Sequence, residues 1–263
     1  MNPSWITEYT QTASHALTAE WFVSPLEYSW PGGKRVADAA FAGVSEPSEG
    51  FDRQLAPHLY REAMVFDFRA KMMVLAYMRE PVAKSYGLEI EGGLCSLYGL
   101  DFRSSIAQWI YIIEGYCKKL FDINDHQKLR ASSWTIPTAG HDLGDQIIAV
   151  IAHALGEYLD GVVFKPTTAA SSQGTRLSRH LMLHGNLENR AFYSQKNALC
   201  LMFVLDALVT IEMLANRHFP AMMELDDGDE RRISRRKQMY ADAMHHALDD
   251  VNVLKLALMD EHA

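Results

Sequence analysis

One long apolar segment decides the fold: residues 194–216 read SQKNALCLMFVLDALVTIEMLAN. Ser194 is a residue type that caps helices, because its hydroxyl accepts a hydrogen bond from a backbone N–H of the first turn. Apolar residues then lie on every side of the helix, interrupted by Asp206. A helix that is apolar all round is buried, so the segment predicts the central helix of a bundle. The apolar run from Ala198 to Ile211 is too short to cross a bilayer.

Helical periodicity also appears on both sides of this segment. Apolar residues recur at helical spacing over residues 52–79, 101–120 and 142–159, and a final helix is predicted for residues 230–260. The glycine-rich stretch 88–100 is predicted to be a loop. Strand signals are weak throughout. The pattern therefore predicts a mainly α protein, organised as a helical bundle.

The first 51 residues are interpreted as an irregular N-terminal extension of this bundle, which comprises residues 52–263. Residues 7–22 are compatible with a helix, but repeated Pro and Gly residues break the pattern beyond them. Aromatic residues with large apolar surfaces are expected to pin the extension to the body. The four residues concerned are Trp5, Trp21, Phe22 and Trp30.

The composition is that of a globular protein, with 263 residues of which 48% are hydrophobic and 22% charged. The formal net charge of −8 gives no overall attraction for nucleic acid, so such a role needs a local basic patch. Three widely separated cysteines fit neither a disulfide framework nor a zinc ribbon. The N-terminus lacks the pattern of a signal peptide, and no glycine-rich phosphate loop is present. We expect a cytoplasmic protein with no membrane span and no cofactor.

Reactive residue types gather shortly before the central helix, in the segment SRHLMLHG, residues 178–185. Arg179 stays protonated, and its planar guanidinium matches phosphate oxygens. His184 titrates near neutral pH and can take up or give a proton. The 2′-hydroxyl of RNA is a built-in nucleophile, so this pair suits RNA cleavage without a metal. His184 would act as general acid or base, and Arg179 would stabilise the charge of the transition state.

Two other interpretations of the segment stay open. An arginine and a histidine five residues apart also occur by chance, and would then form local hydrogen bonds in a purely structural helical protein. Alternatively, His180 and His184 lie four residues apart on one helix face and form a metal-binding pair. That pair needs a third ligand, and no spacing supports the remaining candidates. These candidates are His218, His245 and His246.

The segment and the helix after it resemble the HEPN superfamily of small helical ribonucleases. The family motif is an Arg, four to six further residues and then a His, usually with a polar residue directly after the Arg. Arg179, His180 and His184 match these three positions. The resemblance therefore identifies them as the catalytic residues.

Residues around the motif extend the resemblance. Gly185 follows the histidine, Tyr193 precedes the next helix, and residues 197–199 supply an Asn-Ala-Leu segment inside it. Ser178 departs from the family, in which Asn is common at that position. The resemblance covers at most residues 100–217, which form the expected HEPN-like core.

The resemblance implies a metal-independent endoribonuclease that leaves a 2′,3′-cyclic phosphate and a 5′-hydroxyl. It also implies a homodimer, because two copies of the motif face each other in the active cleft of the family. The implied setting is a defence or toxin–antitoxin system, with RNA as substrate and an antitoxin or defence protein as partner. Some family members are inactive and bind nucleotides or partner proteins, which is the alternative function.

Other charged residues are predicted to support this chemistry. Glu114 and Lys118 match a Glu–Lys spacing that some family members carry on an earlier helix, but the same spacing forms ordinary surface pairs. Three basic residues flank the motif and are predicted to bind RNA phosphates. They are Arg176, Arg190 and Lys196.

Two further features have structural interpretations that compete with functional ones. The basic cluster at residues 231–237 is interpreted as a solvated helix face beside the acidic residues 226–230. Asp206 needs a polar partner if it is buried within its apolar helix. It is expected either to support the site or to cap a neighbouring element.

Overall fold

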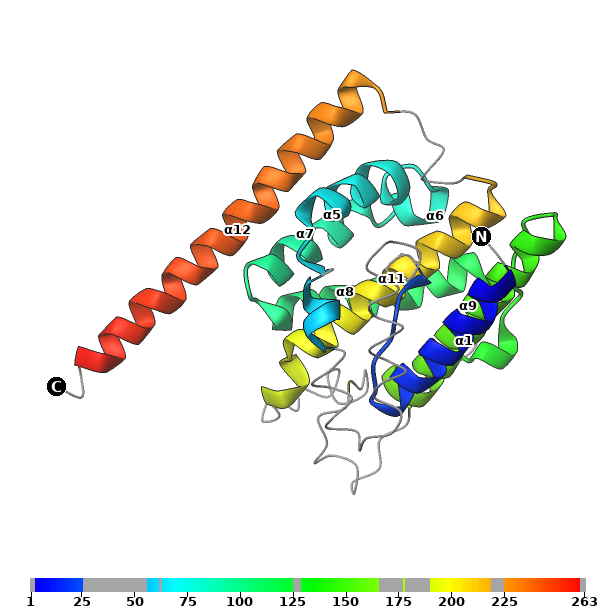
Figure 1. The fold of residues 1–263 in the computed structure, drawn as a ribbon, viewed down its shortest axis with the longest axis horizontal. Coiled ribbons are helices and arrows are strands. Elements are labelled where there is room, and N and C mark those ends of the chain that lie inside the picture. The colour runs from blue at the N-terminus through cyan, green and yellow to red at the C-terminus, as the bar shows by residue number, and fades with distance from the viewer. Residues whose placement is uncertain are drawn as a thin grey trace.

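The regular structure of the chain is entirely helical in the residues that the structure, a computed structural model, describes. These helices pack around a buried apolar core, and Figure 1 shows them gathered about α11. The predicted mainly α class is therefore confirmed. The described residues are 3–25, 56–61, 63–124, 129–165, 177, 190–218 and 225–260.

Short helical turns join or extend the main helices. The α-helices are α1 (Pro3–Thr18), α5 (Phe66–Met72), α6 (Pro81–Lys84), α7 (Gly87–Tyr98), α8 (Phe102–Leu120), α9 (Asp142–Tyr158), α11 (Gln195–Ala215) and α12 (Asp227–Asp260). The π-helical turns η2 (Met73–Tyr77) and η4 (Leu159–Val163) continue α5 and α9. The 3-10 turns η3 (Ala131–Ser133) and η6 (Arg190–Tyr193) precede α9 and α11.

The central element is α11. Its N-cap is Ser194, whose hydroxyl accepts a hydrogen bond from the backbone N–H of Asn197 at 3.2 Å. Every side chain from Asn197 to Leu214 is buried, since α8, α9 and η2 pack around the helix (Figure 1). The predicted central helix and its capping residue are both confirmed.

The stretch 88–100 is predicted to be a loop, but its residues 88–98 belong to helix α7, so that prediction is wrong. The glycines that suggested a loop allow close helix packing. A Cβ atom on Gly93 would lie 2.2 Å from Nε1 of Trp109 on α8, so the backbone of α7 lies directly against the indole ring. Tertiary packing of this kind overrides the low helix propensity of glycine.

Replacing Gly93 by Ala is expected to destabilise the fold. The added methyl group would overlap the buried indole of Trp109, and overpacking lowers the free energy of unfolding by about 1–3 kcal/mol. The control is Gly161→Ala in η4, where a Cβ would meet no atom within 4 Å. Helix propensity predicts that this control gains up to about 1 kcal/mol. Urea unfolding followed by circular dichroism measures both, and equal stability of the two variants would contradict the close contact.

The N-terminal extension is more regular than predicted. Residues 3–18 form α1, which packs beside α9 (Figure 1). The chain after α1 is also anchored, because Trp21 and Phe22 are 1% and 2% exposed. Trp5 is partly buried against the core, so aromatic anchoring by these three residues is confirmed. Trp30 lies outside the described residues.

The single helix predicted for residues 52–79 is divided, so that prediction is wrong in part. Val65, with φ −79° and ψ 84°, separates the helical residues 56–61 from α5. Pro81 begins α6 and does not simply end the preceding helix. Its fixed φ and missing N–H suit the first position of a helix. The apolar pattern runs on across Val65, which is why periodicity alone does not report the break.

The ends of α9 and α11 differ. Gly161 lies inside the π-helical turn η4, which continues α9. At the end of α11, Arg217 adopts the left-handed conformation (φ 60°), and the N–H of His218 donates to the carbonyl of Met213. Nε of Arg217 also donates to the carbonyl of Ala139 at 3.0 Å, which offsets the strain of that conformation.

Helix α12 runs along the outside of the body against α5 and α7, and its C-terminal end reaches beyond them in Figure 1. This helix begins at Asp227, and Asp226 lies directly before it. Oδ1 of Asp226 accepts a hydrogen bond from the backbone N–H of Asp229 at 2.7 Å. This bond lowers the pKa of the Asp226 carboxyl, because it favours the charged form.

Two kinds of contact hold α12 to the body. Tyr240 is fully buried, and its ring centroid lies 5.1 Å from that of Tyr98 on α7. Arg236 forms an ion pair with Glu91 of α7 at 2.6 Å. The other basic side chains of the cluster 231–237 are exposed, as predicted for a solvated face.

Two described helical stretches are long and apolar enough, by length and composition alone, to cross a membrane. They are Asp142–Val163 and Gln195–Ala215. In the fold, 94% of the apolar window in α11 and 56% of that in the other stretch is buried by the rest of the chain. The apolar character of α11 is therefore explained by its central place in the bundle.

Candidate functional site

The predicted catalytic motif lies in a segment whose two ends join the bundle. Leu177 at one end is 1% exposed and belongs to the apolar core. At the other end, η6 leads directly into α11. The following predicted site residues lie outside the described residues: Arg176, Arg179, His180 and His184.

The chain between the motif and α11 is firmly held. Phe192 is 3% exposed, and its carbonyl oxygen accepts a hydrogen bond from Nδ2 of Asn197 at 2.8 Å. Asn197 is itself buried, and its backbone N–H is capped by Ser194. Asn197 therefore holds the turn by which the chain enters α11.

Tyr193 connects this turn to α8. Its ring packs edge-on against Phe192, with centroids 5.0 Å apart and planes at 82°. The guanidinium carbon of Arg103 lies 5.5 Å from the centroid of the Tyr193 ring, within the range of a cation–π contact. Arg103 is exposed and belongs to no sequence motif. Its one sequence signal is its place in the first turn of α8, where a cation opposes the helix dipole.

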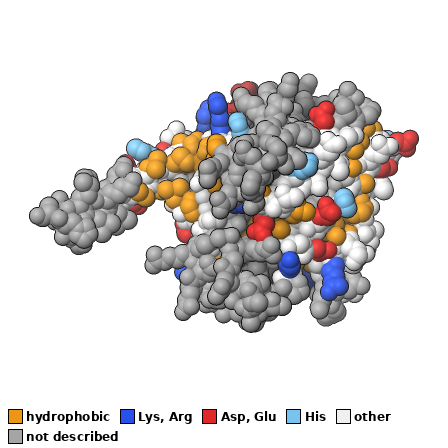
Figure 2. Space-filling view, turned by 60° about the horizontal axis from the view of Figure 1, so that its bottom comes forward, with side chains coloured by type: hydrophobic (Ala, Val, Ile, Leu, Met, Phe, Trp, Pro, Cys, Tyr) orange, Lys and Arg blue, Asp and Glu red, His pale blue; other side chains and the backbone are white. Residues whose placement is uncertain are grey.

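Two predicted RNA-binding residues are described at least in part. Arg190 begins η6, although its side chain lies outside the described part of the chain. Lys196 is partly buried: its Nζ donates to the carbonyl of Ala19 at 2.8 Å and lies 5.0 Å from the ring centroid of Trp21. Lys196 thus ties the N-terminal segment to α11, and RNA binding by it stays a prediction. On the face drawn in Figure 2, basic and acidic side chains are scattered among apolar ones.

The supporting residues Glu114 and Lys118 contact each other. Their charged atoms are 3.4 Å apart, and the side chains are 24% and 21% exposed. This is the intrahelical pair that an i, i+4 spacing favours, which contributes about 0.2–0.5 kcal/mol to a helix. Their pairing is observed, whereas a role in catalysis stays a prediction.

The metal alternative finds no further ligand among the described residues, where no group of three His, Cys, Asp or Glu side chains is placed to hold an ion. His218 lies 2.8 Å, through Nδ1, from Oε1 of Glu80. His245 and His246 are exposed on α12. The predicted histidine pair itself lies outside the described residues.

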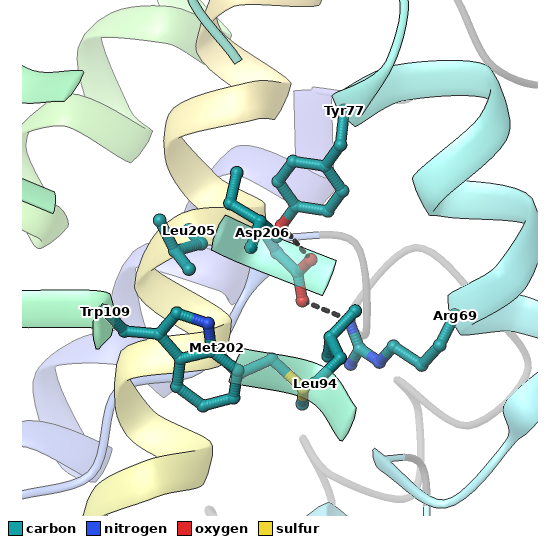
Figure 3. A pocket seen from close by; sticks show the side chains of 8 residues that line it. Arg69, Tyr77, Leu94, Trp109, Met202, Leu205 and Asp206 are labelled. Atoms are coloured by element: carbon teal, nitrogen blue, oxygen red, sulfur yellow. Dashed lines mark hydrogen bonds and ion pairs between the residues drawn. The ribbon is translucent and has the colours of Figure 1, made fainter. Parts of the chain in front are cut away.

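A buried ionic cluster lies midway along α11, at Asp206. This carboxylate is 0% exposed and forms an ion pair with Arg69 of α5, which is 2% exposed. The hydroxyl of Tyr77 in η2 donates to Oδ1 of Asp206 at 2.6 Å (Figure 3). The guanidinium of Arg69 also lies 5.1 Å and 5.8 Å from the ring centroids of Phe68 and Phe203. Asp206 therefore has the buried partner that its position in the sequence required.

The space beside this cluster is too small for a substrate. Arg69, Tyr77 and Asp206 converge on a cavity of about 10 Å³, whose other walls are apolar (Figure 3). Such a volume holds at most about one water molecule. The cluster consequently positions α5 and η2 on α11, and it is not itself a binding site.

Glu212, further along α11, is a second buried carboxylate. It accepts hydrogen bonds from the backbone N–H groups of Val82 and Ala83 at 2.6 and 3.1 Å, and from the hydroxyl of Tyr116 at 2.6 Å. Burial, together with the charge of Glu212, raises the pKa of Tyr116 well above its ordinary value. The hydroxyl therefore stays protonated and donates to Glu212 at neutral pH.

Glu80 is a third buried carboxylate, and it contacts residues just beyond the end of α11. It is 0% exposed and accepts a hydrogen bond from Nδ2 of Asn216 at 2.7 Å. His218 contacts its other oxygen. Together, Glu80, Asp206 and Glu212 fasten the chain from α5 to α6 onto α11. The sequence signals of Asp206 and Glu212 are charges within an apolar run, but Glu80 follows Arg79 directly before Pro81 and carries no such signal.

No protein-family model matches the sequence, and no curated protein and no solved structure matches the chain. The function proposed for this protein therefore depends on its own residues.

Proposed function

We propose that the protein is a metal-independent endoribonuclease of the HEPN type. The observation that carries this proposal is the sequence motif of Arg179, His180 and His184, which precedes a buried helix entered through Tyr193 and Ser194. The all-helical fold and the locked turn before α11 support it, because a helical bundle with such a central helix suits this class of nuclease. The substrate is RNA.

The proposed mechanism uses the substrate's own 2′-hydroxyl. His184 removes or supplies a proton, and Arg179 binds the phosphate and offsets the charge that develops on it in the transition state. The phosphorus–oxygen bond to the next nucleotide breaks, leaving a 2′,3′-cyclic phosphate and a 5′-hydroxyl.

A second copy of the chain is part of this proposal. Five residues along a helix correspond to roughly 140° of rotation, so Arg179 and His184 on one helix would not be stacked. A homodimer can supply the missing half of the site from the partner's motif. A cytoplasmic defence or toxin–antitoxin setting, with an antitoxin or defence protein as partner, is the context that the resemblance suggests.

Replacing His184 or Arg179 by Ala is expected to lower RNA cleavage at least 100-fold, because proton transfer and charge stabilisation each contribute about that much or more. The measurement is cleavage of labelled RNA by the purified protein in EDTA, with identification of the 2′,3′-cyclic phosphate end. The matched control is His246→Ala, which changes an exposed histidine of α12 and is expected to leave cleavage unchanged.

Three outcomes would contradict the proposal. Equal cleavage by the wild type and both variants would show a contaminating nuclease, and cleavage by none of them would show that the protein is not an active enzyme. Loss of cleavage in EDTA would favour the metal alternative. Binding of RNA or nucleotides without cleavage would favour the alternative function, a non-catalytic HEPN-like binding module.

A further inference from the structure

Arg103 presents a guanidinium that is held in place by Tyr193. The centroid of the Tyr193 ring lies 5.5 Å from the guanidinium carbon of Arg103, and that ring packs edge-on against the buried Phe192. The same connection, between Leu177 and α11, carries the predicted catalytic motif. An exposed arginine of α8 therefore contacts the connection that carries the predicted motif.

The hydrogen-bonding capacity of this guanidinium is not used by the part of the chain that the structure describes. An arginine offers five N–H donors, yet Arg103 makes neither a hydrogen bond nor an ion pair with any described residue. Asp101, two residues away, instead accepts a hydrogen bond from the backbone N–H of Ser104 at 3.1 Å. By contrast, Arg236 is paired with the carboxylate of Glu91. No described residue therefore competes with a ligand for the N–H donors of Arg103.

The location of Arg103 brings no benefit to its own helix. It lies in the first turn of α8, where the helix dipole disfavours a positive charge. A residue that opposes a local preference without an evident gain in folding is a candidate for function. Because its charge is positive and its donors form a planar fork, the ligand that fits is an oxyanion.

We propose that Arg103 binds a phosphodiester group of single-stranded RNA, with Tyr193 as the positioning residue that holds its guanidinium. This inference rests on the proposed function, which makes RNA the ligand. The two N–H groups of the fork would contact the two non-bridging oxygens of one phosphate. Arg103 is then a described basic residue that contacts RNA, whereas the amino group of Lys196 already contacts Ala19 and Trp21.

The test measures binding apart from cleavage. A fluorescent 2′-O-methyl oligonucleotide lacks the nucleophile, so its affinity is measured by anisotropy without any reaction. Arg103→Ala is expected to weaken binding about tenfold and to reduce the salt dependence of binding by about one phosphate contact. Tyr193→Leu keeps the arginine but loses its support, so a smaller loss is expected. The matched control is Arg235→Ala, an exposed arginine on α12, which is expected to bind like the wild type.

Each outcome decides the inference separately from the proposed nuclease activity. Wild-type affinity in Arg103→Ala, an equal loss in Arg235→Ala, or no binding by the wild type would overturn it. Circular dichroism checks that Arg103→Ala is folded, and Arg103→Glu, which reverses the charge, gives a second variant that should bind still more weakly. RNA binding that depends on Arg103 without any cleavage would reject the nuclease and keep this contact. Cleavage that depends on His184 but not on Arg103 would do the reverse.

Discussion

Asp206→Ala is expected to lower the free energy of unfolding by about 3–5 kcal/mol, because it removes the buried carboxylate that pairs with the guanidinium of Arg69. The guanidinium of Arg69 is 2% exposed and has its ion pair with Asp206 inside the core. The same change removes the acceptor of the Tyr77 hydroxyl. Urea unfolding of the purified variant measures the loss, and a loss below about 1 kcal/mol would contradict this account.

A matched control separates burial from charge pairing as such. Asp67 and Lys71 also form an ion pair, at 2.8 Å, but their side chains are 45% and 40% exposed. Solvent screens such a pair, so Asp67→Ala is expected to cost less than about 1 kcal/mol. If burial of the partner charge makes Asp206 costly to remove, Asp206→Ala loses more unfolding free energy than Asp67→Ala.

The double variant Arg69→Met with Asp206→Leu tests the pairing directly. Replacing a buried ion pair by apolar residues of similar volume is often neutral or stabilising. We therefore expect the double variant to recover most of the stability that Asp206→Ala loses. Losses that simply add would show that Arg69 and Asp206 are not energetically coupled.

Glu212→Ala is expected to lower the free energy of unfolding by about 3 kcal/mol or more. Three donors lose their acceptor in this variant: the N–H groups of Val82 and Ala83 and the hydroxyl of Tyr116. Hydrogen bonds to charged groups contribute about 1.5–3 kcal/mol each, and their effects overlap when one acceptor serves all three. Glu212→Gln keeps one neutral acceptor oxygen and should recover part of the loss.

Hydrogen exchange gives a local readout of the same contact. The amide protons of Val82 and Ala83 should exchange faster in Glu212→Ala, because the start of α6 loses its acceptor. A double-mutant cycle with Tyr116→Phe measures the coupling across the hydroxyl bond. Unchanged exchange together with additive losses would show that Glu212 does not hold α6.

The pH dependence of stability has a defined sign at Tyr116. Its pKa is higher in the folded protein than in the unfolded chain, where a tyrosine titrates near 10. The folded state therefore binds more protons at high pH, and this contribution to stability is present below about pH 10 and lost as pH rises further. Tyr116→Phe should flatten that decline.

Local patterns in the sequence predicted much of the helical framework. The cap at Ser194 and the helices predicted for residues 101–120 and 194–216 are found as expected, because a cap and its helix involve residues only a few positions apart. The same local logic failed for α7, where Gly93 signals close approach to Trp109 of the next helix. The sequence does not distinguish a glycine in a loop from a glycine that lets a neighbouring helix approach closely.

Some features of the candidate site were visible in the sequence, and others appear only in the structure. Chemical type and spacing suggested Arg179 and His184, the resemblance to the HEPN motif singled them out, and these residues carry the proposed function. The contact between Arg103 and Tyr193 joins α8 to the chain before α11. Because these residues are far apart in the sequence, no local pattern predicts it. Lys196 shows the converse: its place in the sequence suggested RNA, and its observed partners are Ala19 and Trp21.

By itself, the sequence determined that this protein is helical, that residues 194–216 lie at its centre, and that Asp206 needs a partner there. Only the tertiary structure decided that the partner is Arg69, which lies 137 residues away along the chain. The physical reason is that helix periodicity and capping are short-range properties of the backbone. A buried charge, by contrast, is satisfied by whichever side chain the packed helices bring to it.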